Sequence, residues 1–256
     1  MKLYNICMAE ESTGDLFVPR VPNERAHHED DSIPRICLSS SLSGCVSAVP
    51  WGGLQFDEMI LDLGLETESY PFKVYEFDTD DIIEENLIPP SVLYEKDWVR
   101  DAVINDEYWV VNQTLKPRKS YFISITEYIE EVEDCISYEN QKEMDRLDSL
   151  GEPYEYNDYT DGCYSKILAD DYKIIDDSLI TVGDVFTIPL SKFSCDISSD
   201  RFKEILEEAF NNFLVLDNYV SSSYIHKESL VVETDMPCTL VLDNVIKYIN
   251  EECLFD

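Results

Sequence analysis

Basic side chains are scarce in this chain of 256 residues. Nineteen lysines and arginines stand against 54 aspartates and glutamates, which leaves a formal net charge of −35. A surface this negative excludes direct binding of nucleic acid, because phosphates need a basic footprint. It also disfavours anionic membranes. The natural complement is a basic protein surface, including one that normally holds DNA or RNA.

Glycine and histidine are also scarce, with eight and three residues. The sequence contains no P-loop, no G-x-G-x-x-G turn and no G-x-S-x-G elbow, so it gives no sign of the usual nucleotide sites or of a serine hydrolase. His226 is isolated, and His27 and His28 precede three acids. Because adjacent residues of an extended chain point to opposite sides, the five side chains of this HHEDD segment cannot all face one ion. We expect no metal site.

No pair of the eight cysteines has C-x-x-C spacing, which excludes a zinc ribbon. Several lie inside apolar segments and are expected to be buried free thiols of a reducing compartment. The first residues predict a strand rather than a signal peptide. No apolar run approaches the roughly 18 residues that a membrane span requires. We therefore expect a soluble, cytoplasmic protein.

The chain nevertheless has the apolar content of a folded protein, with 44% hydrophobic and 12% aromatic residues. The order of its patterns predicts an α+β fold in two parts. Residues 1–125 form a mixed, strand-rich domain, and residues 126–256 form a more acidic domain of helical and α+β character. Of the 54 acidic side chains, 23 fall in the first part and 31 in the second.

The first part contains alternating or short apolar segments that predict strands. Three serines at 39–41 can cap a helix that runs to about residue 49. Residues 17–22 are extended and restrained by two prolines. The predicted strands are residues 2–7, 34–38, 72–77, 108–111 and 120–125.

The second part opens with the clearest predicted helix, over residues 126–150. Thr126 is a suitable N-cap, glutamates follow in the first turns, apolar residues keep roughly helical spacing, and Gly151 ends the pattern. The remaining predicted elements are a helix at 199–213, strands near 214–216 and 230–233, and a helix at 242–251.

Carboxylates and tyrosines of the second part are the first functional candidate. Carboxylates on a rigid surface can imitate the regular charge of nucleic acid, and tyrosines provide rigid contact area with a polar tip. We interpret them as the surface of an inhibitor that binds a basic nucleic-acid-binding protein, as a mimic or a steric blocker. The structural alternative is a solvated face without a target. The predicted contact residues are Glu130, Glu131, Glu133, Asp134, Glu152, Glu155, Asp158, Asp161, Asp170, Asp171, Asp176, Asp177, Tyr154, Tyr156 and Tyr159.

The second candidate lies between residues 17 and 48. The motifs PRVP (19–22), ED (29–30), PRIC (34–37) and SLSGC (41–45) resemble a group of small proteins of phages and Gram-positive bacteria with an ADP-ribosyltransferase-like fold. The resemblance covers about the first 125 residues. It implies an anti-defence role, with a host nuclease or a CRISPR effector as the target. An anti-CRISPR protein of this kind would act in the host cytoplasm.

The same resemblance implies an alternative function as an NAD-dependent ADP-ribosyltransferase that modifies a partner protein. Glu107 would then be the catalytic acid that stabilises the positive charge developing on the ribose. Residues near the cofactor would be Asn5, Arg20, Arg35 and Ser41, with Asn5 in place of the usual histidine or arginine.

Two further interpretations remain open. In one, Arg20 and Arg35 form buried ion pairs with the acids at 29–31, and Glu107 is a surface acid. In the other, the protein is a scaffold or neutralises a toxin, and its acidity only gives solubility. Neither of these, nor the inhibitor, requires a cofactor.

Overall fold

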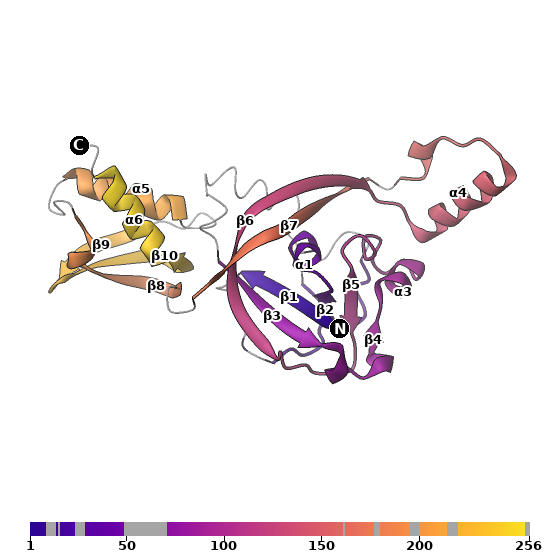
Figure 1. Cartoon of the computed structure of the whole chain (residues 1–256), viewed down its shortest axis with the longest axis horizontal. Coiled ribbons are helices and arrows are strands. Elements are labelled where there is room, and N and C mark those ends of the chain that lie inside the picture. The colour runs from indigo at the N-terminus through magenta and orange to yellow at the C-terminus, as the bar shows by residue number, and fades with distance from the viewer. Residues whose placement is uncertain are drawn as a thin grey trace.

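The computed structural model describes residues 1–8, 14, 16–23, 29–48, 71–160, 162–176, 180–194, 200–213 and 220–253. Within them the chain is an α+β protein, as predicted. It has a seven-stranded and a three-stranded sheet, both antiparallel (Figure 1). No helix of the described residues has the length and hydropathy to span a membrane.

The larger sheet has the strand order β4-β5-β2-β1-β3-β6-β7. Helices α1 (Leu42–Ala48) and α3 (Pro90–Glu95) belong to this part of the molecule. Four of the predicted strands of the first part are confirmed within two residues, and the fifth, at 120–125, is the first part of a longer strand, β6. The strands are β1 (Lys2–Met8), β2 (Ile36–Ser39), β3 (Phe72–Asp78), β4 (Leu87–Ile88), β5 (Glu107–Val110), β6 (Lys119–Asp134) and β7 (Cys163–Ile175).

Helix α1 begins where the serine segment predicted it. The Ser41 Oγ accepts a hydrogen bond from the Gly44 N–H at 2.9 Å, which satisfies one of the free donors of the first turn. The helix packs closely against the loop before β5. A Cβ at Gly44 would lie 2.1 Å from the Asn105 carbonyl oxygen, so only glycine fits at this contact.

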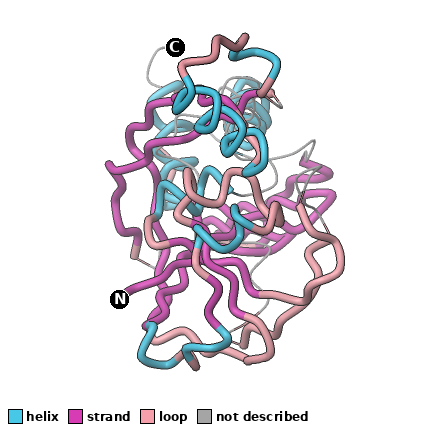
Figure 2. Tube along the Cα trace, turned by 90° about the vertical axis from the view of Figure 1, so that its right-hand side faces the viewer, coloured by secondary structure: helices cyan, strands magenta, loops and turns pink. Residues whose placement is uncertain are grey.

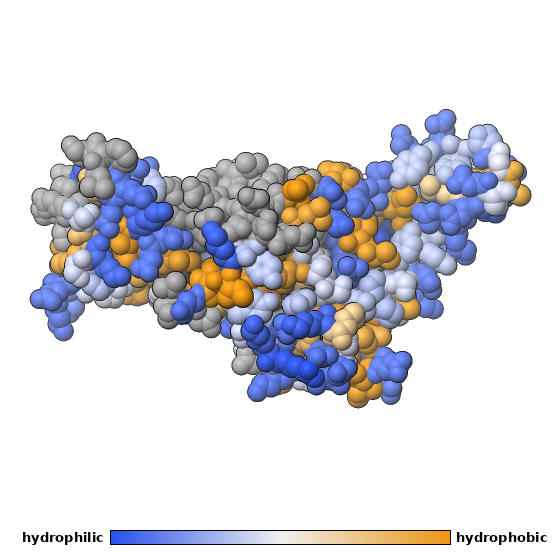
Figure 3. Space-filling model, in the orientation of Figure 1, coloured by the Kyte–Doolittle hydropathy of each residue, from blue (hydrophilic) through white to orange (hydrophobic). Residues whose placement is uncertain are grey.

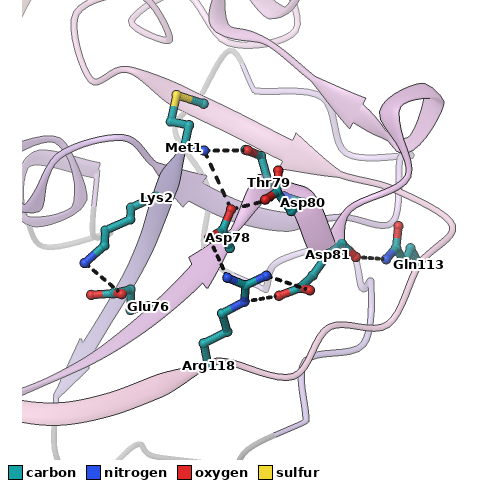
Figure 4. A network of polar contacts seen from close by, with 9 residues as sticks. All are labelled: Met1, Lys2, Glu76, Asp78, Thr79, Asp80, Asp81, Gln113 and Arg118. Carbon is teal, nitrogen blue, oxygen red and sulfur yellow. Dashed lines mark hydrogen bonds and ion pairs between the residues drawn. The ribbon is translucent and has the colours of Figure 1, made fainter.

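The start of β1, the end of β3 and the start of β6 are joined by a polar network (Figure 4). The Arg118 guanidinium lies 2.6 Å from a carboxylate oxygen of Asp78 and 2.6 Å from one of Asp81. The terminal amine of Met1 donates to Thr79 Oγ1 at 2.8 Å. Asp78 and Asp81 therefore each have a basic partner close by.

The predicted helix over residues 126–150 is wrong in its first part. Strand β6 continues to Asp134, paired with β7, and crosses the predicted division after residue 125. Helix α4 (Tyr138–Leu150) starts only after Ser137, whose Oγ accepts from the Asn140 N–H at 3.3 Å. Its end at Gly151, which has a φ of +67°, agrees with the prediction.

At residues 126–134, pairing with a distant strand decides the structure, although the apolar residues there have helical spacing. Thr126, Ile129 and Val132 are β-branched and suit a strand as well as a helix. The matching strand lies more than thirty residues further along the chain, where local periodicity gives no information about it.

The smaller sheet has the order β8-β10-β9 and forms a unit with two helices. Its elements are β8 (Ile180–Pro189), α5 (Asp200–Phe213), β9 (Val220–His226), β10 (Ser229–Val241) and α6 (Leu242–Glu252). One face of the sheet packs on the helices through a separate apolar cluster that includes Phe186, Ile205, Val232 and Ile249. Both predicted helices are confirmed. The predicted strand at 214–216 lies outside the described residues.

Candidate functional site

Two of the residues predicted for a cofactor site, Arg35 and Glu107, lie in one buried cluster on the larger sheet. The Arg35 side chain is fully buried and forms an ion pair with Glu29. Its guanidinium carbon lies 4.0 Å from the centroid of the Trp109 ring, a cation–π contact. Trp98 stacks on Trp109 with a centroid distance of 5.9 Å and an interplanar angle of 3°.

Glu107 is held within this cluster and is not the surface acid of the structural alternative. The Trp109 Nε1 donates to its Oε1 at 2.7 Å. Burial, and then the charges of Asp101 and Glu29, raise the pKa of Glu107 to about 8. Near pH 7 its carboxyl group is therefore mostly protonated.

Three ligand-type side chains meet at this point. The Cys37 Sγ and carboxylate oxygens of Glu29 and Glu107 lie within 4.8 Å of one another. Among the described residues these could hold a metal ion. The Arg35 guanidinium already supplies positive charge beside Glu29, and burial raises the pKa of the Cys37 thiol well above its usual value. Both effects oppose a cation at this position.

The other predicted cofactor residues make structural contacts. The Asn5 Nδ2 donates to the Cys37 carbonyl oxygen at 3.1 Å. Arg20 forms a two-residue β-bridge with Arg35 through main-chain hydrogen bonds of 3.1 and 2.9 Å, and its side chain is exposed. Ser41 caps α1. The ion pair of Arg35 with the acidic segment is thus confirmed, through Glu29.

Access to the buried cluster is limited in this conformation. Arg35 is 2% exposed and Glu107 is 7% exposed. The cluster therefore packs the loop before β5 onto the sheet and compensates charge there.

The predicted partner-binding residues concentrate in a second region, which we call the arm and define as residues 129–168. It consists of the far ends of β6 and β7, helix α4 and the turn that follows it. Figure 1 shows the two strands continuing past the rest of the sheet toward α4, and Figure 2 views the molecule from the α4 side. The side chains of Glu130, Asp161, Asp170, Asp171 and Asp177 lie outside the described part, and Asp176 is exposed just after β7.

The segment after α4 folds back on that helix in an ordered way. The Tyr154 and Tyr159 rings meet edge to face with centroids 5.5 Å apart, and the Tyr154 hydroxyl donates to Asp148 at 3.4 Å. The Asn140 Nδ2 donates to the Tyr159 carbonyl oxygen at 2.9 Å. The predicted tyrosines and acids are therefore brought together on one folded element.

Carboxylates of the arm outnumber its basic groups. Lys142, Arg146 and Lys166 pair with Glu139, Glu143 and Glu133 at 3.6, 2.7 and 4.0 Å. Figure 3 shows a mostly hydrophilic surface around α4. The exposed carboxylates of the arm without a salt bridge to any described basic side chain are Glu131, Asp134, Asp145, Asp148, Glu152, Glu155 and Asp158.

Sequence reasoning missed the exposed apolar residues of the arm. Ile129 and Val132 are each 64% exposed, although their spacing suggested the buried face of a helix. In a strand, Ile129 shares its face with Glu127 and Glu131, and Val132 shares its face with Glu130 and Asp134. A strand with acids on both faces buries neither face completely, but this signal can be used only once the segment is known to be a strand.

Comparisons with protein-family models, with curated proteins and with solved structures gave no match.

Proposed function

We propose that this chain is an acidic inhibitor that binds the basic nucleic-acid-binding surface of a bacterial defence protein, a nuclease or a CRISPR effector. The observation that carries this proposal is the surplus of exposed carboxylates on the ordered arm. A basic groove built for phosphates would attract such an element over a long range and exclude like-charged partners.

The arm supports competition with nucleic acid on geometric grounds. A strand advances about 3.3 Å per residue and a helix about 1.5 Å. The carboxylates of the arm, which lie on such regular elements, are therefore held at fixed separations, as phosphates are along a duplex. A mimic and a steric blocker both predict that the partner binds either this protein or nucleic acid.

Capture followed by displacement tests the proposal. The full chain would be used to capture proteins from lysates of bacteria that carry defence systems, with washes across a salt series. Each captured protein is then purified and bound to a labelled DNA duplex. We expect this chain to release the duplex, with an affinity that falls as salt rises. Captured proteins that bind no nucleic acid, or competition unchanged at high salt, would contradict the proposal.

Matched variants distinguish binding through the arm from a general effect of the net charge of the molecule. Removing four charges from the arm should weaken partner binding roughly 100-fold, because clustered charges face one groove. Removing four exposed charges between residues 80 and 95, outside the arm, should leave it nearly unchanged. Equal weakening by both variants would assign binding to net charge alone. The arm variant is Glu131→Gln, Glu152→Gln, Glu155→Gln and Asp158→Asn, and the control is Asp80→Asn, Glu84→Gln, Glu85→Gln and Glu95→Gln.

The second candidate is an ADP-ribosyltransferase-like fold that uses NAD to modify a partner. It is supported by the proximity of Arg35 and Glu107, and by the raised pKa of Glu107, a property common in catalytic acids. It predicts NAD consumption that Glu107→Gln abolishes while the fold remains intact. An unchanged NAD concentration in the presence of the captured partner would exclude it.

A further inference from the structure

The arm exposes an apolar side chain on each of its two faces. Ile129 pairs with Leu168 and Val132 with Ser165, in a register that continues without a shift to Asp134. Because side chains alternate along a strand, residues three apart point to opposite faces. Ile129 and Val132 are both 64% exposed, so neither face of the ribbon is covered at these positions by described residues.

A two-stranded ribbon with uncovered faces is an unusual element. Such ribbons are marginally stable in water, and sheets normally bury at least one face. The smaller sheet shows the ordinary case. Its helices cover one face, and the apolar residue Val185 is 51% exposed on the other. A flat partner could cover the smaller sheet, but it would leave half of the arm uncovered.

Charge restricts what can cover the arm. Glu131 and Asp134 are exposed beside the two apolar residues, on opposite faces of the same strand. A second copy of this chain would bring two strongly negative arms together, which like-charge repulsion opposes. The occupant that fits is a protein groove with basic rims and apolar walls.

We propose that the arm inserts into the nucleic-acid groove of its partner, so that the groove walls contact both faces of the ribbon at Ile129 and Val132. This inference rests on the proposed function. It adds that binding combines electrostatic attraction with burial of an apolar residue on each face, and that the second contribution does not depend on salt.

Photocrosslinking from both faces tests this geometry. A benzoylphenylalanine replaces Ile129, Val132 or, as a control, Val185 in the full chain. The probe is the DNA-displaceable protein obtained by capture. We expect crosslinks from positions 129 and 132, both lost with excess duplex DNA, and none from position 185. Crosslinks from only one of the two positions would overturn insertion and leave the inhibitor intact.

Other outcomes are equally decisive. Crosslinks within the free chain or between two copies at both positions would assign the arm a different occupant and overturn the inference. If no DNA-displaceable protein is captured, it is the proposed function that fails.

Polar substitutions provide a second measurement. Ile129→Ser and Val132→Ser should each weaken partner binding about tenfold, by the same factor at low and high salt. Val185→Ser should have no effect, and Glu131→Gln should reduce the salt dependence. Serine variants that bind as tightly as the wild type, with circular dichroism unchanged, would overturn the proposal.

Discussion

Carboxylates occupy two very different environments in this protein. In the buried cluster, Glu29 is paired with Arg35 and Glu107 accepts a hydrogen bond from Trp109. On the arm, most carboxylates face solvent without a described basic partner. The cluster is stable because its groups are paired or protonated, whereas the arm depends on hydration of charges that remain available to a partner.

The comparison also corrects the formal charge. Burial raises the pKa of Glu107 to about 8, so the net charge at neutral pH is less negative than the count of residues suggests. The carboxyl group that loses its charge lies in the cluster. The negative field of the molecule therefore comes from exposed regions such as the arm.

Removing one basic residue from each region should give the largest difference in the free energy of unfolding between the two regions. Arg35→Ala leaves Glu29 without its buried partner and removes the contact with Trp109, so the free energy of unfolding should fall by about 3–5 kcal/mol. Arg146→Ala breaks an exposed pair and should leave stability unchanged. Urea denaturation followed by tryptophan fluorescence measures both, since Trp98 and Trp109 lie in the cluster. Equal losses would show that the buried pair has no special role.

A smaller effect is expected from Glu107→Gln, and it depends on pH. The folded-state pKa of about 8 exceeds the usual 4.5, so the folded protein retains a proton that the unfolded chain releases. The contribution of Glu107 to the free energy of unfolding is fully present below about pH 4.5 and is lost as the pH rises through 8. Glutamine stays neutral, so the variant should gain on the order of 3 kcal/mol relative to wild type between pH 5 and 8.

Unfolding at several pH values measures that difference. Glu84→Gln, at an exposed position, is the control and should follow the wild-type profile. A constant difference between Glu107→Gln and the wild type would mean that Glu107 is ionised in the folded protein.

The smallest effect concerns the arm itself. Its four-charge variant should unfold at a slightly higher temperature, by about 2 °C or less, because repulsion is reduced while no core contact changes. Calorimetry at low and high salt measures this shift, which should disappear at high salt. A marked fall in the unfolding temperature would show that the arm acids stabilise the fold.

Local patterns predicted those elements whose information is local. The strand at 72–77 has the alternation of a half-buried strand. The helices at 199–213 and 242–251 have clear apolar faces, and the serine cap and Gly151 specify helix ends by hydrogen bonding and by a positive φ. The acids and tyrosines of the arm were predicted as a contact surface because composition alone indicates excess charge, and this role stays a prediction.

The same reasoning failed where distant segments meet. The continuation of β6 depends on pairing with β7. The buried cluster depends on Arg35, next to β2, meeting Glu107 and Trp109 of β5, about seventy residues further along the chain. Nothing within a short window distinguishes a strand from a helix at residues 126–134, or a buried glutamate from an exposed one.

The sequence by itself determined the α+β class, the strong negative charge and most helix boundaries, because composition, periodicity and capping act over a few residues. Only the tertiary structure decided which acids keep their charge and where those acids lie. A carboxylate's pKa depends on its burial and neighbours, and the shape that presents it depends on strand pairing across more than thirty residues.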